Sequence, residues 1–167
     1  RRAFWLRWLA ESAVQLIRQS LLLDRKLELS ANSDLIFPHA ALCLSEAANR
    51  AGFSKASDLD GLETHDCFSI TEYMAIDHAG LTPPGQGWQA VEEGRIQKDG
   101  DFPINASGGL IGTGHPVGAT GVRMLLDCAK QVTGKADGYQ LDQPKNMLTF
   151  NVGGSTTTCA SFVVGVQ

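Results

Sequence analysis

Apolar residues near the start of the chain recur as they would on one face of a helix. This spacing predicts a helix over residues 3–22, with an apolar face made of Phe4, Trp8, Leu16 and Ile17. Turn-forming residues and a proline in residues 31–38 interrupt the pattern. A second helix is expected from about residue 38 to residue 50, closed by Gly52 at the position of a left-handed cap.

The middle of the chain alternates short regular elements with irregular ones. Residues 59–64 form an apolar run typical of a strand, and a helix is predicted over residues 69–78, ending at Gly80. Residues 81–101 are rich in proline and glycine, and we expect them to contribute no core element. Residues 105–121 are denser still in glycine, which marks backbone that needs positive φ or a close approach to another group.

The C-terminal part of the chain predicts one helix and two strands. The helix covers residues 122–132 and ends at Gly134, with an apolar face made of Val122, Leu125, Leu126, Ala129 and Val132. Strands are expected over residues 147–152 and 159–166, joined by a hairpin that contains glycine. This order of elements favours an α/β fold with a mixed sheet covered by helices, rather than a bundle or a barrel.

Composition supports a globular protein and narrows the classes of partner. Apolar residues make up 43% of the 167 residues and charged residues 19%, which argues against disorder. Fourteen basic and eighteen acidic residues give a net charge of −4. Nothing in that balance attracts nucleic acid or anionic lipid, so we expect neither as a partner.

The cysteines and the first apolar stretch bear on the compartment. Four cysteines occur without a CxxC pair, which favours reduced thiols over a disulfide scaffold. Charged and amide side chains interrupt residues 4–23, so this stretch is not expected to span a membrane. A cytoplasmic protein is the first expectation, with the peroxisome or the mitochondrial matrix as alternatives. Because the chain begins with Arg1 and not with Met, we expect it to be a piece of a longer protein.

The first candidate for chemistry is the tetrapeptide His-Asp-Cys-Phe at residues 65–68. Cys67 precedes a predicted helix, whose unsatisfied amides and dipole favour a thiolate. His65 lies two residues earlier on an extended segment, so its side chain points to the same side. This proximity suits proton transfer, but a buried structural thiol beside a surface histidine fits the spacing too.

The second candidate is His115, within the Gly-His-Pro sequence of residues 114–116. The following proline keeps His115 extended, and the flanking glycines allow a substrate to come close. An imidazole fixed in this way suits a general base. A phosphate-binding loop fits poorly because no Gly-Lys-Ser/Thr follows. A tight loop with an incidental histidine stays an open alternative.

The third candidate is the sequence Asn-Val-Gly-Gly at residues 151–154. Adjacent glycines at a strand end can direct backbone N–H groups toward one point and form an oxyanion hole, although this motif taken alone favours an ordinary hairpin turn. No metal site is expected, because His65, Asp66 and Cys67 are contiguous and cannot converge on one ion as spaced ligands do.

Together these motifs resemble the thiolase superfamily. Residues 108–121 are similar to the Gly-His-Pro segment of the family over its full length. Residues 65–68 resemble the His-Asp-Cys-Phe motif of the sterol-carrier-protein type thiolases, where ordinary thiolases carry Asn-Glu-Ala-Phe. Asn151 stands where the family's Cys-x-Gly motif has its cysteine, and the same branch also lacks that cysteine. The resemblance implies a thiolase C-terminal domain over residues 38–167, preceded by an unassigned, helical segment over residues 1–37.

The resemblance also implies roles for single residues. Cys67 would be the acid/base thiol that moves a proton at the α-carbon. His115 would activate the nucleophile and polarise the thioester oxygen, and His65 would assist in the first oxyanion hole. The amide of Gly153 would belong to the second oxyanion hole, while Phe68 and Asn151 would line the substrate pocket.

The implied activity is thiolytic cleavage of 3-oxoacyl-CoA, or the reverse condensation of two acyl-CoAs. Coenzyme A would be a substrate, and no cofactor is implied. The nucleophilic cysteine would lie in an N-terminal half that this chain does not contain, so the chain alone should not turn over. A homodimer or higher oligomer that includes the missing half is expected.

Two other functions stay open. A thiolase-like module could bind acyl-CoA or a partner subunit without catalysis, but a module of that kind has no chemical need for His65, Cys67 and His115 together. A retro-aldolase of the same fold, acting on sterol side chains, would be expected to depart from the Gly-His-Pro pattern, which is unbroken here.

Overall fold

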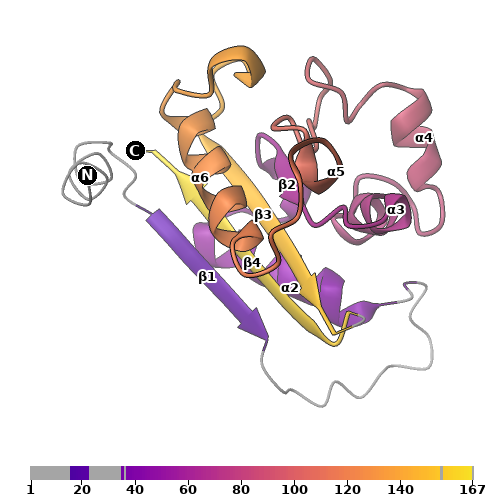
Figure 1. The fold of residues 1–167 in the computed structure, drawn as a ribbon. Coiled ribbons are helices and arrows are strands. Elements are labelled where there is room, and N and C mark those ends of the chain that lie inside the picture. Colours follow the sequence, from indigo (N-terminus) through magenta and orange to yellow (C-terminus); the bar gives the residue numbers. More distant parts are fainter. Residues whose placement is uncertain (1–15, 23–34, 36, 155, 167) are drawn as a thin grey trace.

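A four-stranded mixed sheet lies at the centre of the fold (Figure 1). The computed structural model describes residues 16–22, 35, 37–154 and 156–166. The strands follow the order β1-β4-β3-β2 across the sheet. Their bounds are Leu16–Leu22 for β1, Leu62–Thr64 for β2, Asn146–Gly153 for β3 and Thr158–Gly165 for β4. The expected α/β fold with a mixed sheet is thereby confirmed.

The sheet is antiparallel except at its short edge strand. Strands β3 and β4 form an antiparallel hairpin, with Leu148 opposite Val163, and β1 pairs antiparallel with the other side of β4. Strand β2 runs parallel to β3, with Thr64 opposite Phe150. The two parallel strands therefore end at the same edge of the sheet, which is where the first and third candidate motifs begin.

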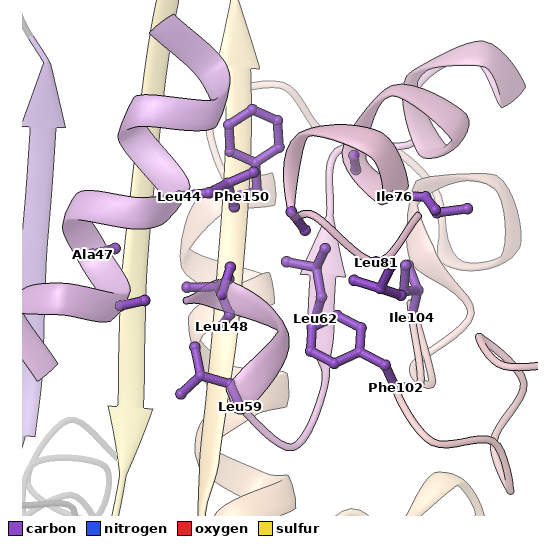
Figure 2. Close-up of a cluster of buried hydrophobic side chains, with 14 of the residues drawn as sticks. Leu44, Ala47, Leu59, Leu62, Ile76, Leu81, Phe102, Ile104, Leu148 and Phe150 are labelled. Carbon is purple, nitrogen blue, oxygen red and sulfur yellow. The ribbon is translucent and has the colours of Figure 1, made fainter. Parts of the chain in front are cut away.

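Helices cover both faces of the sheet (Figure 1). They are α2 Pro38–Ala51, α3 Ser69–His78, α4 Gly87–Glu92, α5 Gly109–Thr113 and α6 Thr120–Val132, with 3₁₀ turns at Ala56–Asp58 and Asp137–Tyr139. Along β3, Leu148 and Phe150 pack with Leu44 of α2 in the larger core (Figure 2), while Met147 packs with Cys128 of α6 in a smaller one. This alternation is the two-residue period of a strand that is buried on both faces.

Several predicted elements are confirmed. Helix α2 begins with Pro38 in its first turn and ends at Gly52, which has a φ of 93° and caps the helix in the left-handed conformation. Helix α3 covers the range expected for it, and the C-terminal hairpin forms as predicted. The predicted strand over residues 59–64 is shorter in the structure, because only Leu62–Thr64 pairs with β3.

The helix predicted over residues 3–22 is wrong where the structure describes it. Residues 16–22 form strand β1, paired along its whole length with β4. The exposed edge of β4 offers backbone hydrogen bonds to an extended chain, and this tertiary pairing overrides the local apolar spacing. The remainder of that helix, and most of the turn expected over residues 31–38, lie outside the described residues.

Two further expectations need correction. Residues 81–101 do contribute to the core, since they form α4 and bury Leu81 and Ala90. The apolar face predicted for α6 is also partly wrong, because Val122 is 70% exposed while Met124 is buried. Val122 lines a cavity described below, and Leu125 both lines that cavity and packs against the smaller core.

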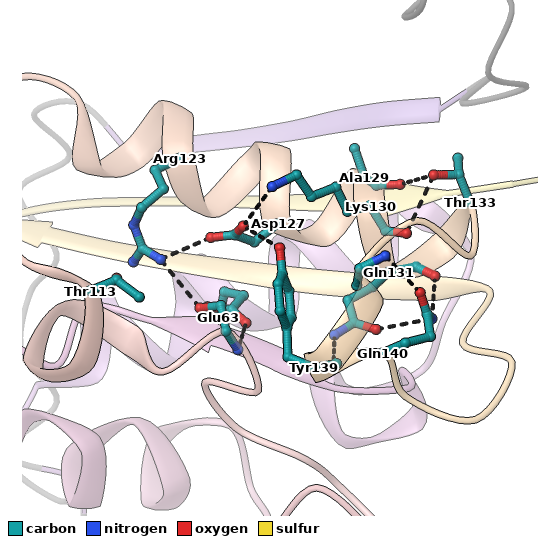
Figure 3. Close-up of polar contacts among 12 residues, drawn as sticks. Glu63, Thr113, Arg123, Asp127, Ala129, Lys130, Gln131, Thr133, Tyr139 and Gln140 are labelled. Atoms are coloured by element: carbon teal, nitrogen blue, oxygen red, sulfur yellow. Dashed lines mark hydrogen bonds and ion pairs between the residues drawn. The ribbon is translucent and has the colours of Figure 1, made fainter.

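A buried polar network links β2, the glycine-rich loop and α6 (Figure 3). Both carboxylate oxygens of Glu63 contact Ser107, one accepting its backbone N–H at 3.1 Å and the other lying 2.6 Å from its hydroxyl. Arg123 donates to the Ser107 hydroxyl and, at 2.8 Å, to Asp127, which also accepts the hydroxyl proton of Tyr139. Burial raises the pKa of Glu63 to about 7.

We expect Glu63→Gln in the complete protein to remove a pH-dependent loss of stability. A carboxyl whose pKa is raised on folding stabilises the fold below its unfolded pKa, and this contribution disappears as the pH rises through about 7. The free energy of unfolding of the variant minus that of wild type should therefore increase by about 1–3 kcal/mol from pH 5 to pH 8. Urea denaturation at the two pH values measures the difference, with the exposed Glu93→Gln as control. A difference that does not change with pH would contradict the assignment.

Candidate active site

The predicted site residues come together around one cavity of about 820 Å³. The loop after β2, the loop between α5 and α6, the start of α6 and the β3–β4 hairpin form its walls. All the residues that the sequence singled out for chemistry are in the lining: His65, Cys67, Phe68, His115, Asn151 and Gly153. A volume of this size lies within the range typical of small-molecule sites.

The parallel pairing of β2 with β3 positions His65. Its backbone N–H donates to the carbonyl of Phe150 at 2.9 Å and so extends the ladder by one residue beyond β2. Asn151, the residue after Phe150, therefore lies beside His65, and its side chain acts on the pKa of that imidazole. The hydroxyl of Thr71 lies 2.7 Å from the carbonyl of His65 and 2.6 Å from that of Phe68, which ties the loop to α3.

Asp66 connects this loop to the glycine-rich one. Its buried carboxylate accepts the backbone N–H of Leu110 at 2.6 Å, at the start of α5. Any side chain at Gly109, which has a φ of 60°, would collide with the same carboxylate. The sequence suggested no role for Asp66 beyond metal binding, which its neighbours excluded. The glycine pair before Leu110 is the signal in the sequence for a close approach of this kind.

The imidazole of His115 faces that of His65. The two rings meet edge to face, with their centroids 4.8 Å apart and an interplanar angle of 88°. His115 Nδ1 lies 2.7 Å from the hydroxyl of Thr120, a buried residue at the start of α6 that also contacts the carbonyl of Pro116 at 3.3 Å. When Thr120 donates to Pro116, it accepts from Nδ1–H, and this tautomer leaves Nε2 of His115 with its lone pair. Thr120 was not predicted as a site residue.

Burial favours the neutral form of His65. Desolvation lowers its pKa, and the nearby His115 lowers it further, while the hydrogen bond with Asn151 acts in the opposite direction. His65 Nδ1 is buried and has no hydrogen-bond partner among the described residues. A neutral imidazole in this place can donate or accept a hydrogen bond without adding charge to the cavity.

The four thiols lie in very different surroundings. Cys67 is partly exposed and lines the cavity, whereas the other three are buried. Burial raises the pKa of Cys43 to about 12 and that of Cys159 to about 11, and it raises the pKa of Cys128 well above its ordinary value. These three thiols stay protonated at neutral pH and cannot act as nucleophiles or bases.

The hairpin alternative for the third motif is confirmed, and it places Gly153 in the cavity wall. Gly153 ends β3 opposite Thr158 and precedes Gly154, which turns the chain with a φ of 55°. The oxyanion-hole role of Gly153 stays a prediction.

Among the described residues, no group of three or more His, Cys, Asp or Glu side chains could hold a metal ion. No described helix combines the length and apolar character needed to cross a bilayer.

Comparisons with known proteins agree with this geometry. Acetyl-CoA acetyltransferase of Methanothermobacter thermautotrophicus is 41% identical over 103 residues, 62% of this chain and 27% of that protein. Sterol carrier protein 2 of Bos taurus is 35% identical over 149 residues, 87% of this chain and 27% of that protein. The chain thus spans about a quarter of the length of these relatives.

A solved structure shares the fold. An Ltp2-ChsH2(DUF35) aldolase matches with a TM-score of 0.72 over 92% of this chain and 39% of that chain, at 18% identity. The family model described as "Thiolase C-terminal domain-like" matches residues 24–166, so it begins earlier than the boundary at residue 38 expected from the sequence. The match over most of the chain, together with the relatives and the fold, shows that this chain belongs to the thiolase C-terminal domain-like family.

Proposed function

We propose that this chain supplies the acid/base side of a thiolase, which cleaves 3-oxoacyl-CoA with coenzyme A or condenses two acyl-CoAs. The nucleophilic cysteine would come from a part of the protein outside these 167 residues. The observation that supports the proposal is the convergence of His65, Cys67, His115 and Asn151 on one cavity. The names of the relatives, an acetyl-CoA acetyltransferase among them, support acyl-CoA as the substrate class.

In the cleavage direction, Cys67 would deliver one proton. The nucleophilic sulfur adds to the C3 carbonyl of the 3-oxoacyl-CoA, and the C2–C3 bond then breaks with its electron pair left on C2. The thiol of Cys67 protonates C2 and releases an acyl-CoA. The resulting Cys67 thiolate takes the proton of the incoming coenzyme A thiol, whose sulfur accepts the acyl group from the enzyme. In condensation, the same steps run in reverse.

The two histidines and Gly153 would act on oxygen atoms and on the nucleophile. His115, with Nε2 unprotonated, can take the proton of the nucleophilic thiol, and the resulting imidazolium can donate a hydrogen bond to the thioester oxygen. When the acyl group passes to coenzyme A, the departing sulfur takes this proton back. Neutral His65 would assist in this first oxyanion hole, and the amide of Gly153 would contribute to the second one. Asn151 orients His65 but cannot transfer a proton, which leaves that task to Cys67.

Cys67 should be the most reactive of the four thiols in the complete protein. It is the thiol that reaches the cavity, while burial raises the pKa of each of the others. Competitive alkylation with iodoacetamide near neutral pH, followed by mass spectrometry, measures the order of modification. Equal labelling of Cys67 and Cys159 would count against a catalytic thiol.

Cys67→Ala should abolish carbon–carbon bond making and breaking, yet leave transfer of an acyl group to the nucleophilic cysteine. That half-reaction needs no proton transfer at the α-carbon. Asn151→Ala should be far milder, since it removes only a hydrogen bond to His65, worth about 1 kcal/mol or fivefold in rate. Trapping of labelled acyl-enzyme, alongside steady-state assays, separates the two roles. A fully active Cys67→Ala enzyme would refute the assignment.

His115→Ala should lower kcat by roughly 10²–10⁴, the range for loss of a positioned acid/base group, with little change in acyl-CoA affinity.

Thr120→Val should lower kcat by about fivefold, the worth of one hydrogen bond, because the imidazole remains but its tautomer is no longer fixed. Thr120→Ser is the matched control and should restore the rate. The ¹⁵N chemical shifts of His115 report the tautomer directly, and an unchanged Nδ1–H form in Thr120→Val would contradict this role for Thr120.

A further inference from the structure

A β-branched residue in the β3–β4 hairpin has a strained backbone conformation. The backbone N–H of Thr157 donates to the carbonyl of Gly154 at 3.1 Å, which closes a β-turn with Thr156 at its third position. Thr156 has a φ of 70°, in the left-handed region where glycine is the usual residue at this position of a turn. A β-branched side chain disfavours that region by roughly tenfold or more, so contacts outside the turn have to stabilise it.

Two donors from outside the turn meet the carbonyl of Thr156. Nε2 of His39, in the first turn of α2, is hydrogen bonded to this carbonyl, and because a carbonyl only accepts, Nε2 carries the proton. The thiol of Cys159 lies 3.8 Å from the same oxygen, and burial raises its pKa to about 11, so it keeps the proton that it donates. His39 and Thr156 are 117 residues apart in the sequence. A tertiary contact thus offsets the local strain.

Packing at the start of α2 gives His39 a fixed place. Its imidazole meets the ring of Phe37 edge to face, with the ring centroids 6.0 Å apart and an interplanar angle of 82°. The backbone N–H of Phe37 donates in turn to Nε2 of His78 at 3.2 Å, which ties the start of α2 to α3. Further along α2, Leu44 packs with Cys159 of β4 in the larger core. The helix that carries His39 is therefore anchored on both sides of the contact with the hairpin.

The strained turn adjoins the part of the hairpin that faces the candidate active site. Gly153 directly precedes the turn and lies opposite Thr158 in the last pair of the β3–β4 ladder. The lining of the cavity at the candidate active site includes the hairpin residues Gly153, Gly154, Thr156 and Thr158. Gly153 has no side chain to restrict its backbone, and the space beside its Cα is open. The direction of its amide therefore depends on how the turn is held.

We propose that His39 is a positioning residue for the amide of Gly153. By holding the carbonyl of Thr156, it keeps the hairpin in the turn that places this amide at the cavity, although His39 is not itself in the lining. The proposal rests on the proposed function, in which the Gly153 amide contributes to the second oxyanion hole. Since His115 and His65 serve the thioester oxygen, this hole would stabilise the charge on the carbonyl oxygen that the nucleophile attacks.

His39→Ala in the complete protein should slow acyl transfer without weakening substrate binding. Loss of one hydrogen bond corresponds to about fivefold, so kcat and the single-turnover rate of acyl-enzyme formation should each fall about fivefold at unchanged KM. The final amount of labelled acyl-enzyme should equal that of wild type, whereas a merely structural role would lower this amount and leave the rate constant unchanged. His39→Gln keeps a donor near the place of Nε2 and should restore the rate. Asn49→Ala, exposed near the other end of α2, is the control.

A second substitution tests the strain itself. Thr156→Gly removes the side chain that disfavours the left-handed conformation, so the turn no longer needs the contact with His39. In the Thr156→Gly protein, His39→Ala should change the rate of acyl-enzyme formation by less than about twofold. Thr157→Gly is the matched control, because Thr157 lies in the same turn without a positive φ, and there the effect of His39→Ala should persist. Equal effects of His39→Ala in the wild-type and Thr156→Gly proteins would overturn the proposal.

A measurement without substrate separates the positioning role from the reaction. In ¹⁵N relaxation with glycine-selective labelling, the order parameter of the Gly153 amide should fall from about 0.85 to below about 0.6 in His39→Ala. It should return to the wild-type value when Thr156→Gly is added. These changes in a protein that forms no acyl-enzyme would refute the proposed thiolase function and retain the positioning role. An unchanged order parameter at Gly153 would refute the positioning role even in an active thiolase.

Discussion

The parallel pairing of β2 with β3 is the interaction on which the site depends. It is short, with Leu62, Glu63 and Thr64 opposite Leu148, Thr149 and Phe150, and the N–H of His65 adds one more hydrogen bond to Phe150. Because parallel strands end at the same edge, the loop with His65 and Cys67 and the strand end with Asn151 meet there without any long connection. Register matters as much as direction, since a slip of one residue would turn His65 to the other face of the sheet.

The position of His115 depends on different contacts. Its loop has little regular structure, and glycine makes it permissive, so its place must come from anchors at both ends. Asp66 fixes the start of α5, and the Glu63–Ser107–Arg123 contacts fix the segment before it (Figure 3). Thr120 fixes the imidazole itself from the first turn of α6. Asp66, Glu63 and Arg123 therefore contribute to the geometry of a cavity whose lining does not include them.

The sequence predicts the elements whose ends are marked by proline or glycine. Gly52 and Pro38 mark the ends of α2, and the glycines after Val152 mark the hairpin, because these residues act through local backbone geometry. The strand β1 could not be predicted in this way, since its extended form depends on the edge of β4, which lies far away in the sequence. The candidate chemistry was found from residue types and order, whereas the contacts of Asp66 and Thr120 require knowledge of which loops lie side by side.

The contact between Asp66 and the backbone at Leu110 also limits how such a site can change over time. A side chain larger than hydrogen at Gly109 collides with the carboxylate, so the residues allowed at 66 and at 109 depend on each other. Substitutions at residues in contact combine non-additively, so a side chain at residue 109 would be tolerated only after Asp66 had been replaced by a smaller residue. The loop with Cys67 and the loop with His115 should therefore be exchanged together. A chimaera that received only one of them would place a new residue against the retained partner at the contact between residue 66 and residues 109–110.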